Sequence, residues 1–293
     1  MEPLRVAVHR GTFVECVHEV HGVAVREGET AAAFGDPSLV ASLRSAAKPL
    51  QALPLARAYP ELGDEELAIA AASHFGTERH VEAVRKLLAA TGGREEELDC
   101  GIQEGRRPEP IYDNCSGKHA GMLAVCRAYG WPVDGYRHPE HPLQRLLLEE
   151  VAAAAELRPD ELGTGIDGCG VVAFARPLER AALAYSRLEQ LDGGSRVAAA
   201  MRAHPVLVGG DGATDTTLMQ QHPGLVAKGG AEGLICAGGR GTGLALKVAD
   251  GNPRALRPAL AVLGRELGVP LDGFAEVTVR NRHGDEAAVV SVL

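Results

Sequence analysis

A serine and a lysine three residues apart are the first pair in this chain that could do chemistry. They are the ends of the segment Ser45-Ala-Ala-Lys48. Positions i and i+3 are neighbours on a helix face, so the amine can reach the hydroxyl. A lysine kept neutral by burial or by a nearby cation could take the serine proton and activate the oxygen for attack. The same spacing also fits a serine at a helix start beside an unrelated lysine, and Pro49 disfavours regular helix at this point.

Lysine is scarce in this chain, which makes each lysine informative. Only five of the 30 basic residues are lysines, and the rest are arginines. Arginine keeps its proton in practice, whereas a buried lysine can lose it and act as a base. Compositional drift is the alternative explanation for any single lysine. Four of the five fall in candidate site segments, namely Lys48, Lys118, Lys228 and Lys247.

A second group combines two thiols with an amine. Cys115 and Lys118 share one polar segment, and Cys169 lies in a later glycine-rich turn. Two thiolates suit Zn²⁺, and a neutral amine or a histidine could complete the site. Buried structural thiols without a metal are the alternative. Polar neighbours in the two segments are Asn114, His119 and Asp167, and the other histidines that could bind a metal are His138 and His141.

Glycine-rich strand ends and one further serine complete the candidates. Gly230 follows Lys228-Gly, and Gly239 ends the next expected strand. Backbone N–H groups at such positions could stabilise an oxyanion, although tight turns explain the glycines equally well. Lys247 is a second amine if it points at the site and an exposed strand cation if it does not. Ser73 ends an apolar helical run, where capping or packing is the alternative role.

The elements that must position these residues are strands at both ends of the chain and helices between them. One antiparallel sheet built from both termini, about 1–35 and 222–293, with an inserted helical region, about 36–221, predicts an α+β fold in a single domain, 1–293. Strands are expected at 4–10, 12–18, 21–27, 224–230, 233–239, 243–249, 275–281 and 286–293. Helices are expected at 45–58, 65–73, 77–91, 116–129, 142–156, 177–189, 193–203, 214–221 and 253–267.

Composition and charge narrow the partners. The net charge of −9 gives no basic footprint for nucleic acid, so a small neutral or zwitterionic substrate is expected instead. No apolar run reaches transmembrane length and no export leader is visible, which predicts a cytoplasmic protein without a membrane partner. Reduced thiols are therefore expected for the six cysteines. No motif calls for an organic cofactor.

Eight ordered segments together resemble the asparaginase II family, the rhizobial-type or class 3 L-asparaginases. The resemblance runs over nearly the whole chain, and eight segments in order are far more specific than any one of them. The segments are 44–55, 72–84, 114–123, 135–144, 165–170, 215–219, 228–233 and 243–251.

The resemblance implies a fold like the class A serine β-lactamases and related glutaminases, usually as a homodimer. It implies hydrolysis of L-asparagine to L-aspartate and ammonia through an acyl-enzyme. Carried onto matching positions, Ser45 with Lys48 is one nucleophile–base pair and Ser73 with Lys247 is a second. Cys115, Lys118 and Cys169 would bind zinc beside the substrate. Substrate-binding residues are expected among Asn114, His119, Asp167, Gly230 and Gly239.

This chain departs from the family pattern at a few positions. Cys16 stands where a serine is expected in V-E-S-x-H, His74-Phe75 replaces a more polar pair, and 209–214 lack an expected arginine. Two other functions remain open. A penicillin-recognising acyl transferase would share S-x-x-K and the strand lysine Lys228, although an S-x-N tripeptide and an export signal are missing. A zinc- or ligand-binding protein without turnover would need only the thiols and histidines.

Overall fold

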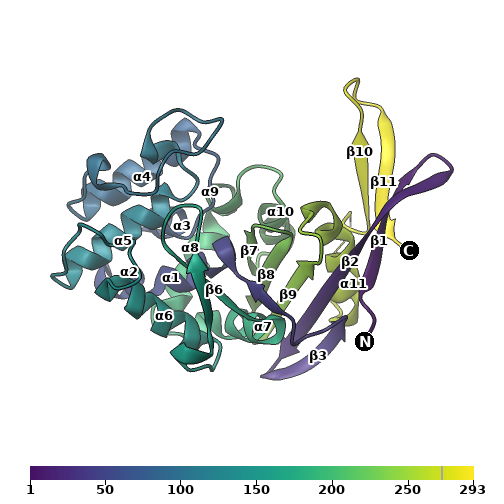
Figure 1. Cartoon of the computed structure of the whole chain (residues 1–293), viewed down its shortest axis with the longest axis horizontal. Helices are drawn as coiled ribbons and strands as arrows, with labels where there is room; N and C mark the ends of the chain where they lie inside the picture. Colours follow the sequence, from purple (N-terminus) through teal and green to yellow (C-terminus); the bar gives the residue numbers. More distant parts are fainter. Residues whose placement is uncertain (272) are drawn as a thin grey trace.

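Strands from both ends of the chain form one antiparallel sheet in the computed structural model, which describes residues 1–271 and 273–293 (Figure 1). The eight strands lie in the order β10-β11-β1-β2-β9-β8-β7, and β3 also pairs with β2. The expected α+β class is therefore confirmed, with the two chain ends close together at one side of the molecule (Figure 1). The strands are β1 (Leu4–Arg10), β2 (Phe13–Arg26), β3 (Glu29–Phe34), β7 (Val226–Gly230), β8 (Leu234–Gly239), β9 (Thr242–Val248), β10 (Glu276–Arg280) and β11 (Glu286–Val292).

Helices occupy most of the chain between these two sets of strands. Residues 78–90 show why, because Val81, Val84 and Leu88 recur at helical spacing and are buried on one face. None of the helices in the described part of the chain is long and apolar enough to cross a membrane. The helices are α1 (Lys48–Gln51), α2 (Leu53–Ala58), α3 (Asp64–Ala70), α4 (Glu78–Ala90), α5 (Ser116–Ala128), α6 (Pro142–Ala154), α7 (Leu178–Arg187), α8 (Gly194–Ala203), α9 (Pro205–Gly209), α10 (Thr214–Gln221) and α11 (Leu256–Glu266).

A second, smaller sheet packs against α6, α7 and the turn that carries Ser45. Its strands, in the order β4-β6-β5, are β4 (Val40–Ser42), β5 (Gly163–Ile166) and β6 (Val172–Pro177), and none of them was expected from the sequence. The sheet also takes a backbone hydrogen bond from Leu43, which donates to Phe174. It therefore fixes the chain just before the Ser45 segment.

Helices α7 and α11 cover opposite faces of the large sheet. Adjacent residues of a strand point to opposite faces. A Cβ at Gly238 would lie 2.4 Å from the Tyr185 carbonyl oxygen and one at Gly243 only 2.0 Å from that of Ala182, so α7 rests directly on the glycines of β8 and β9. The neighbouring residues Ala237 and Leu244 face the other side, where α11 lies.

Two expected elements differ from the structure. The strands expected at 12–18 and 21–27 are one continuous strand, β2, because its residues 20–26 pair with β9 and β3 without a turn at Glu19. The helix expected at 45–58 is three short pieces: a 3₁₀ turn η1 (Arg44–Ala47), then α1 and α2. Pro49 and Pro54 each stand in the first two positions of a new helix, where a missing N–H costs nothing.

Candidate active site

Lys48 is the centre of a buried polar cluster. It begins α1, its side chain is about 1% exposed, and its Nζ donates to the carbonyl oxygens of Ala72 at 2.6 Å and Asn114 at 3.4 Å. The third contact of Nζ is with Ser73 Oγ, at 2.9 Å. A neutral amine has two N–H donors and one lone pair. The two carbonyls can therefore take the donors while the lone pair accepts from the Ser73 hydroxyl.

The surroundings of Lys48 favour that neutral form. Burial lowers the pKa of its amine, and the nearby charges of Lys118 and Lys228 lower it further, against an opposing effect from Cys115. Loss of water and repulsion from like charges both disfavour an ammonium group. The amine is thus suited to accept a proton rather than to carry one.

Ser45 lies one 3₁₀ turn before Lys48 and is partly exposed. Within the described chain no hydrogen bond joins its hydroxyl to Lys48, whose serine contact is Ser73. Arg44, the residue before it, has a φ of 46°, a left-handed conformation that is strained outside glycine. The Arg44 Nε donates to Asp167 Oδ1 at 2.7 Å, which holds this conformation in place. Strain of this kind is common where a side chain must be presented to a ligand.

Strand β7 packs against the same turn at Gly230. A Cβ at Gly230 would lie 2.6 Å from the Leu43 carbonyl oxygen, so only glycine allows this approach. The structure therefore brings Gly230 beside the Ser45 turn. Its role in binding an oxyanion remains a prediction.

The two expected metal-binding thiols meet beside Lys118. Cys115 precedes α5 and Cys169 lies between β5 and β6, yet the Lys118 Nζ is 3.0 Å from Cys169 Sγ. The pKa of the Cys115 thiol lies well below its usual range, chiefly because Cys169 hydrogen bonds to its sulfur, and Lys48 and Lys118 add to this against burial. Cys169 keeps its own proton for this hydrogen bond, and the bond with Cys115 raises the pKa of Cys169. The charges of Lys48 and Lys118 thus favour the thiolate form at Cys115.

The ligand chemistry of this group fits zinc in part. Sulfur donors are what zinc prefers. Across residues 1–271 and 273–293, however, no three His, Cys, Asp or Glu side chains are arranged to hold a metal, so Lys118 would have to be the third protein ligand. Its pKa is raised by the two thiols despite burial, and it would have to lose that proton to bind.

Asp167 stands between the thiols and the Ser45 turn. Its Oδ1 accepts from Arg44 Nε and from the Gly168 N–H at 2.8 Å. Burial acts to raise the pKa of its carboxyl, but Lys118 and these two donors outweigh burial and keep the pKa low. A charged carboxylate therefore borders the cluster.

Lys228, on β7, is the strand lysine that this cluster contains. Its side chain is about 2% exposed and lies 3.3 Å from Asp215 Oδ2, at the start of α10. The same carboxylate oxygen accepts from the Gly229 N–H at 2.9 Å. The positive charge of Lys228 lowers the pKa of Lys48, so Lys228 lies close enough to influence the Lys48–Ser73 contact. The signal in the sequence was a lysine followed by two glycines at a strand end.

Lys247 is in a different place, which corrects the expected Ser73–Lys247 pair. It lies on β9 opposite His21 and Leu234, its Nζ donates to the Val248 carbonyl, and the acidic groups that act on it are Glu232 and Asp250. One strand, β8, lies between β9 and β7, and strands are about 4.8 Å apart, so the backbones that carry Lys247 and Lys228 are roughly 10 Å apart across the sheet. Ser73 has Lys48 as its amine partner instead.

His119 is brought beneath the cluster but has no direct contact with Lys48. Its Nδ1 forms a hydrogen bond of 2.6 Å with the Tyr136 hydroxyl, whose oxygen also accepts from the Asp99 N–H. Its Nε2 is buried and has no partner within the described residues. Burial lowers the pKa of His119 well below its usual value. Asn114 contributes only its carbonyl to Lys48.

His74 was not singled out for a role in the sequence, yet it anchors the Ser73 loop. Its Nδ1 accepts from the Gly76 N–H at 3.1 Å, so its Nε2 donates to Ser116 Oγ at 2.9 Å. That hydroxyl in turn donates to the Ile111 carbonyl at 2.8 Å. The chain after Ser73 is thus tied to the first turn of α5, which carries the thiol–amine group.

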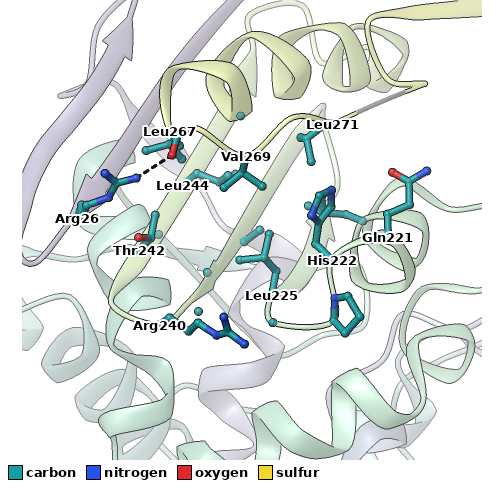
Figure 2. Close-up of a pocket in the computed structure, with 18 residues that line it drawn as sticks. Arg26, Gln221, His222, Leu225, Arg240, Thr242, Leu244, Leu267, Val269 and Leu271 are labelled. Atoms are coloured by element: carbon teal, nitrogen blue, oxygen red, sulfur yellow. Dashed lines mark hydrogen bonds between the residues drawn. The ribbon is translucent and has the colours of Figure 1, made fainter.

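Gly239 lies outside this cluster, in a large cavity on the other side of the sheet (Figure 2). The cavity holds about 600 Å³ and is bordered by the ends of α10 and α11. Figure 2 shows Leu225, Leu244 and Val269 pointing into it, with Arg26 and Arg240 at its edge. The expected role of Gly239 beside the serines is therefore not supported by its position.

A family comparison covers nearly the whole chain. Residues 6–291 match the family described as L-asparaginase II. A comparison with curated protein sequences found no significant match. The assignment to this family therefore rests on the match of residues 6–291 to the family, and not on similarity to an individual curated protein.

Solved structures give a looser likeness. The protein Mglu, crystallised in its native form in 4.3 M NaCl, is 15% identical with a TM-score of 0.48, over 87% of this chain and 62% of Mglu. A β-lactamase from Mycobacterium bovis is 16% identical with a TM-score of 0.34, over 80% of this chain and 88% of that protein. This chain thus spans less than two thirds of Mglu, and both TM-scores are low.

Proposed function

Because this chain belongs to the L-asparaginase II family and is a hydrolase that acts on an amide, we propose that it converts L-asparagine to L-aspartate and ammonia. The observation that carries the proposal is the contact of the buried Lys48 amine, whose pKa is lowered, with the Ser73 hydroxyl. An amine in that state can move protons at neutral pH, and a serine in contact with it can pass them on.

Ser45 is the proposed nucleophile. It follows the strained residue Arg44 at the start of a helical turn, and Lys48 comes one turn later. Its oxygen attacks the side-chain amide carbon of asparagine, and its proton passes to Lys48. The C–N bond then breaks, the nitrogen leaves as ammonia and an ester remains on Ser45. Water hydrolyses the ester and returns the proton to the serine.

Ser73 is proposed to carry the proton between Lys48 and the leaving nitrogen. Its oxygen is the group that Lys48 already contacts, and it lies on a loop that His74 holds against α5. With such a relay, the Lys48 amine does not have to move from Ser45 to the leaving nitrogen. General acid catalysis of this kind typically contributes about 10²–10⁴-fold to a rate.

Charged groups around the serines would hold the two ends of an amino acid. Lys228 is a candidate to attract the α-carboxylate, and the Asp167 carboxylate, next to Arg44, is a candidate to bind the α-ammonium group. Opposite charges at two fixed positions would orient the side-chain amide between them. Glutamine, one methylene longer, would place its amide differently.

Zinc remains a proposed cofactor. Cys115, Cys169 and Lys118 would hold the ion, and the lowered pKa of the Cys115 thiol, with the Lys118–Cys169 contact, supports that assignment. When bound, zinc would supply a positive charge that orients the substrate or the dyad. The homodimer and the cytoplasmic location also remain predictions.

Ammonia release by the purified protein tests the proposal. L-Asparagine, L-glutamine and the chromogenic cephalosporin nitrocefin should be compared side by side with wild type, Ser45→Ala and Lys48→Met. Turnover of asparagine that both variants abolish, with an acyl-enzyme mass detected on quenching, is the expected result. Turnover of nitrocefin alone would support the penicillin-recognising alternative, and no turnover of any substrate would support a binding protein.

A further inference from the structure

A second cluster of reactive groups lies on the large sheet, apart from the lysine cluster. Cys16 and His18 share one side of β2, and Asp250 and Arg254 reach them from the segment after β9. Cys16 Sγ lies 3.7 Å from His18 Nε2, and His18 Nδ1 lies 2.6 Å from Asp250 Oδ2. Thiol, imidazole and carboxylate thus stand in the order that activates a nucleophile, with the base oriented by the acid.

Hydrogen bonds fix the protonation of this group. Asp250 can only accept, because its pKa is lowered by the Asn252 N–H and His18 despite burial, so His18 Nδ1 carries the proton. His18 Nε2 is then an acceptor, and it receives Arg254 Nε at 2.8 Å. The same guanidinium donates through Nη2 to Cys16 Sγ at 3.0 Å. Arg254 therefore joins the base to the sulfur and would stabilise a negative charge there.

Accessibility sets Cys16 apart from the other thiols. Cys100, Cys115, Cys126, Cys169 and Cys236 are buried, whereas Cys16 is partly exposed. His18 is about 3% exposed, so the imidazole is held rigidly, while Asp250 and Arg254 are on the surface. A reagent in solution can therefore reach the sulfur. Among the described residues, no three His, Cys, Asp or Glu side chains are arranged to hold a metal, and this cluster is no exception. The positive charge of Arg254 would also repel a cation from it.

We propose that Cys16 is a base-assisted thiol that forms mixed disulfides with anionic low-molecular-weight disulfides. The sulfur attacks one sulfur of the reagent, and its proton passes to His18 Nε2 as Arg254 Nε releases that nitrogen. A new S–S bond forms at Cys16, the S–S bond of the reagent breaks, and the departing thiolate takes the proton from His18. The disulfide reagent is the oxidant, Cys16 is oxidised and one thiol is released. The positive charge of Arg254 attracts the negative reagent, and Arg254 Nη2 keeps its hydrogen bond to Cys16 Sγ throughout.

The rate of mixed-disulfide formation tests this. Wild type is incubated with glutathione disulfide, quenched in acid and mapped by peptide mass spectrometry, so that each of the six cysteines is followed separately. Folded Cys16 should react at least about tenfold faster than Cys16 in the urea-unfolded chain, since a positioned base typically contributes 10²-fold or more. Equal or slower reaction of folded Cys16 would overturn the proposal.

Two surface variants separate activation from simple exposure. Asp250→Asn removes the group that orients His18, and Arg254→Gln removes the cation, and both should bring the Cys16 rate down toward that of the unfolded chain. Unchanged circular dichroism and unchanged amide hydrolysis establish that each variant is folded. Wild-type rates in both variants would overturn the proposal.

The charge of the reagent tests the preference for anions. Arg254→Gln should slow reaction with the anionic 5,5′-dithiobis(2-nitrobenzoic acid) more than reaction with the neutral 4,4′-dipyridyl disulfide. Losses of equal size with the two reagents would overturn the anionic specificity.

Discussion

Lys48 Nζ lies 2.9 Å from Ser73 Oγ, although the two residues are 25 positions apart in the chain. The same nitrogen is fixed by the Ala72 carbonyl at 2.6 Å, so the end of α3 and the start of α1 hold each other. Lys48 is thus in direct contact with Ser73, whereas Ser45 precedes it by one helical turn. The two serines should therefore differ in what they contribute.

Substitution of each serine separates attack from proton relay. Ser45→Ala should remove acyl-enzyme formation altogether, whereas Ser73→Ala should lower kcat by about 10²–10⁴-fold, the usual contribution of a general acid–base group. Quenched samples examined by mass spectrometry measure the ester on Ser45. An ester formed on Ser73 in the Ser45→Ala variant would reverse the two roles.

The two strand lysines make a matched pair. Lys228→Met should lower kcat/KM for L-asparagine by at least about tenfold, because a buried cation within reach of the site is lost. Lys247→Met should leave it within about twofold, because this lysine contacts the Val248 carbonyl two strands away. Steady-state kinetics on both variants decide the matter, and a larger loss from Lys247→Met would restore the Ser73–Lys247 pair.

Lys48→Met should inactivate the protein and stabilise it. A lysine whose folded pKa is lowered binds fewer protons in the folded than in the unfolded state, so wild-type stability rises with pH between the lowered pKa and about 10.4. The gain from Lys48→Met is then greatest below that lowered pKa and is lost as the pH rises to about 10.4. Urea unfolding at several pH values measures it. A gain that does not change with pH would argue against a shifted Lys48.

Metal content tests the thiol–amine group. Cys115→Ser and Cys169→Ser should each lower bound zinc by about 10-fold or more, and Cys126→Ser, another buried cysteine on α5, should not. Elemental analysis after dialysis against zinc gives the readout. Equal zinc in all four proteins would remove these sulfurs as ligands.

Arg176 predicts an unusual gain in stability. It is about 1% exposed, and its Nε, Nη1 and Nη2 have no hydrogen-bond partner in the described part of the chain. Burial lowers its pKa to about 10. Arg176→Met keeps an unbranched apolar chain as far as the Nε position and removes the unpaired donors, so the free energy of unfolding should rise by about 1–3 kcal/mol. Arg176→Ala is the control, since it leaves a cavity and should lower stability. A loss with Arg176→Met would show that the donors are satisfied.

Much of the fold could be predicted because its signals are local. Apolar spacing located α4, and turn residues located the β10–β11 hairpin. The small sheet was missed because β4 has three residues and β5, Gly163–Ile166, is exposed and holds two glycines. Neither strand alternates apolar and polar residues over the four to eight positions that this signal needs.

The site was predictable only where its residues are close in sequence or matched the family pattern. The Ser45–Lys48 spacing is local, and the meeting of Cys115 with Cys169 was implied by the resemblance. The choice between Lys228 and Lys247 depends on which strand lies at the edge of the sheet next to the Ser45 turn. That edge is β7, and strand order is set by long-range pairing, which a single sequence does not reveal.

The position of β1 has a consequence for how a new chain matures. β1 pairs with β2 on one side and with β11 on the other. During synthesis the first pairing can form at once, but the second edge stays open until residues 286–292 have left the ribosome. An open strand edge invites pairing with other chains. Nascent chains are therefore exposed to aggregation at β1 until residues 286–292 emerge, and a chaperone that shields residues 4–10 would act before β11 is made.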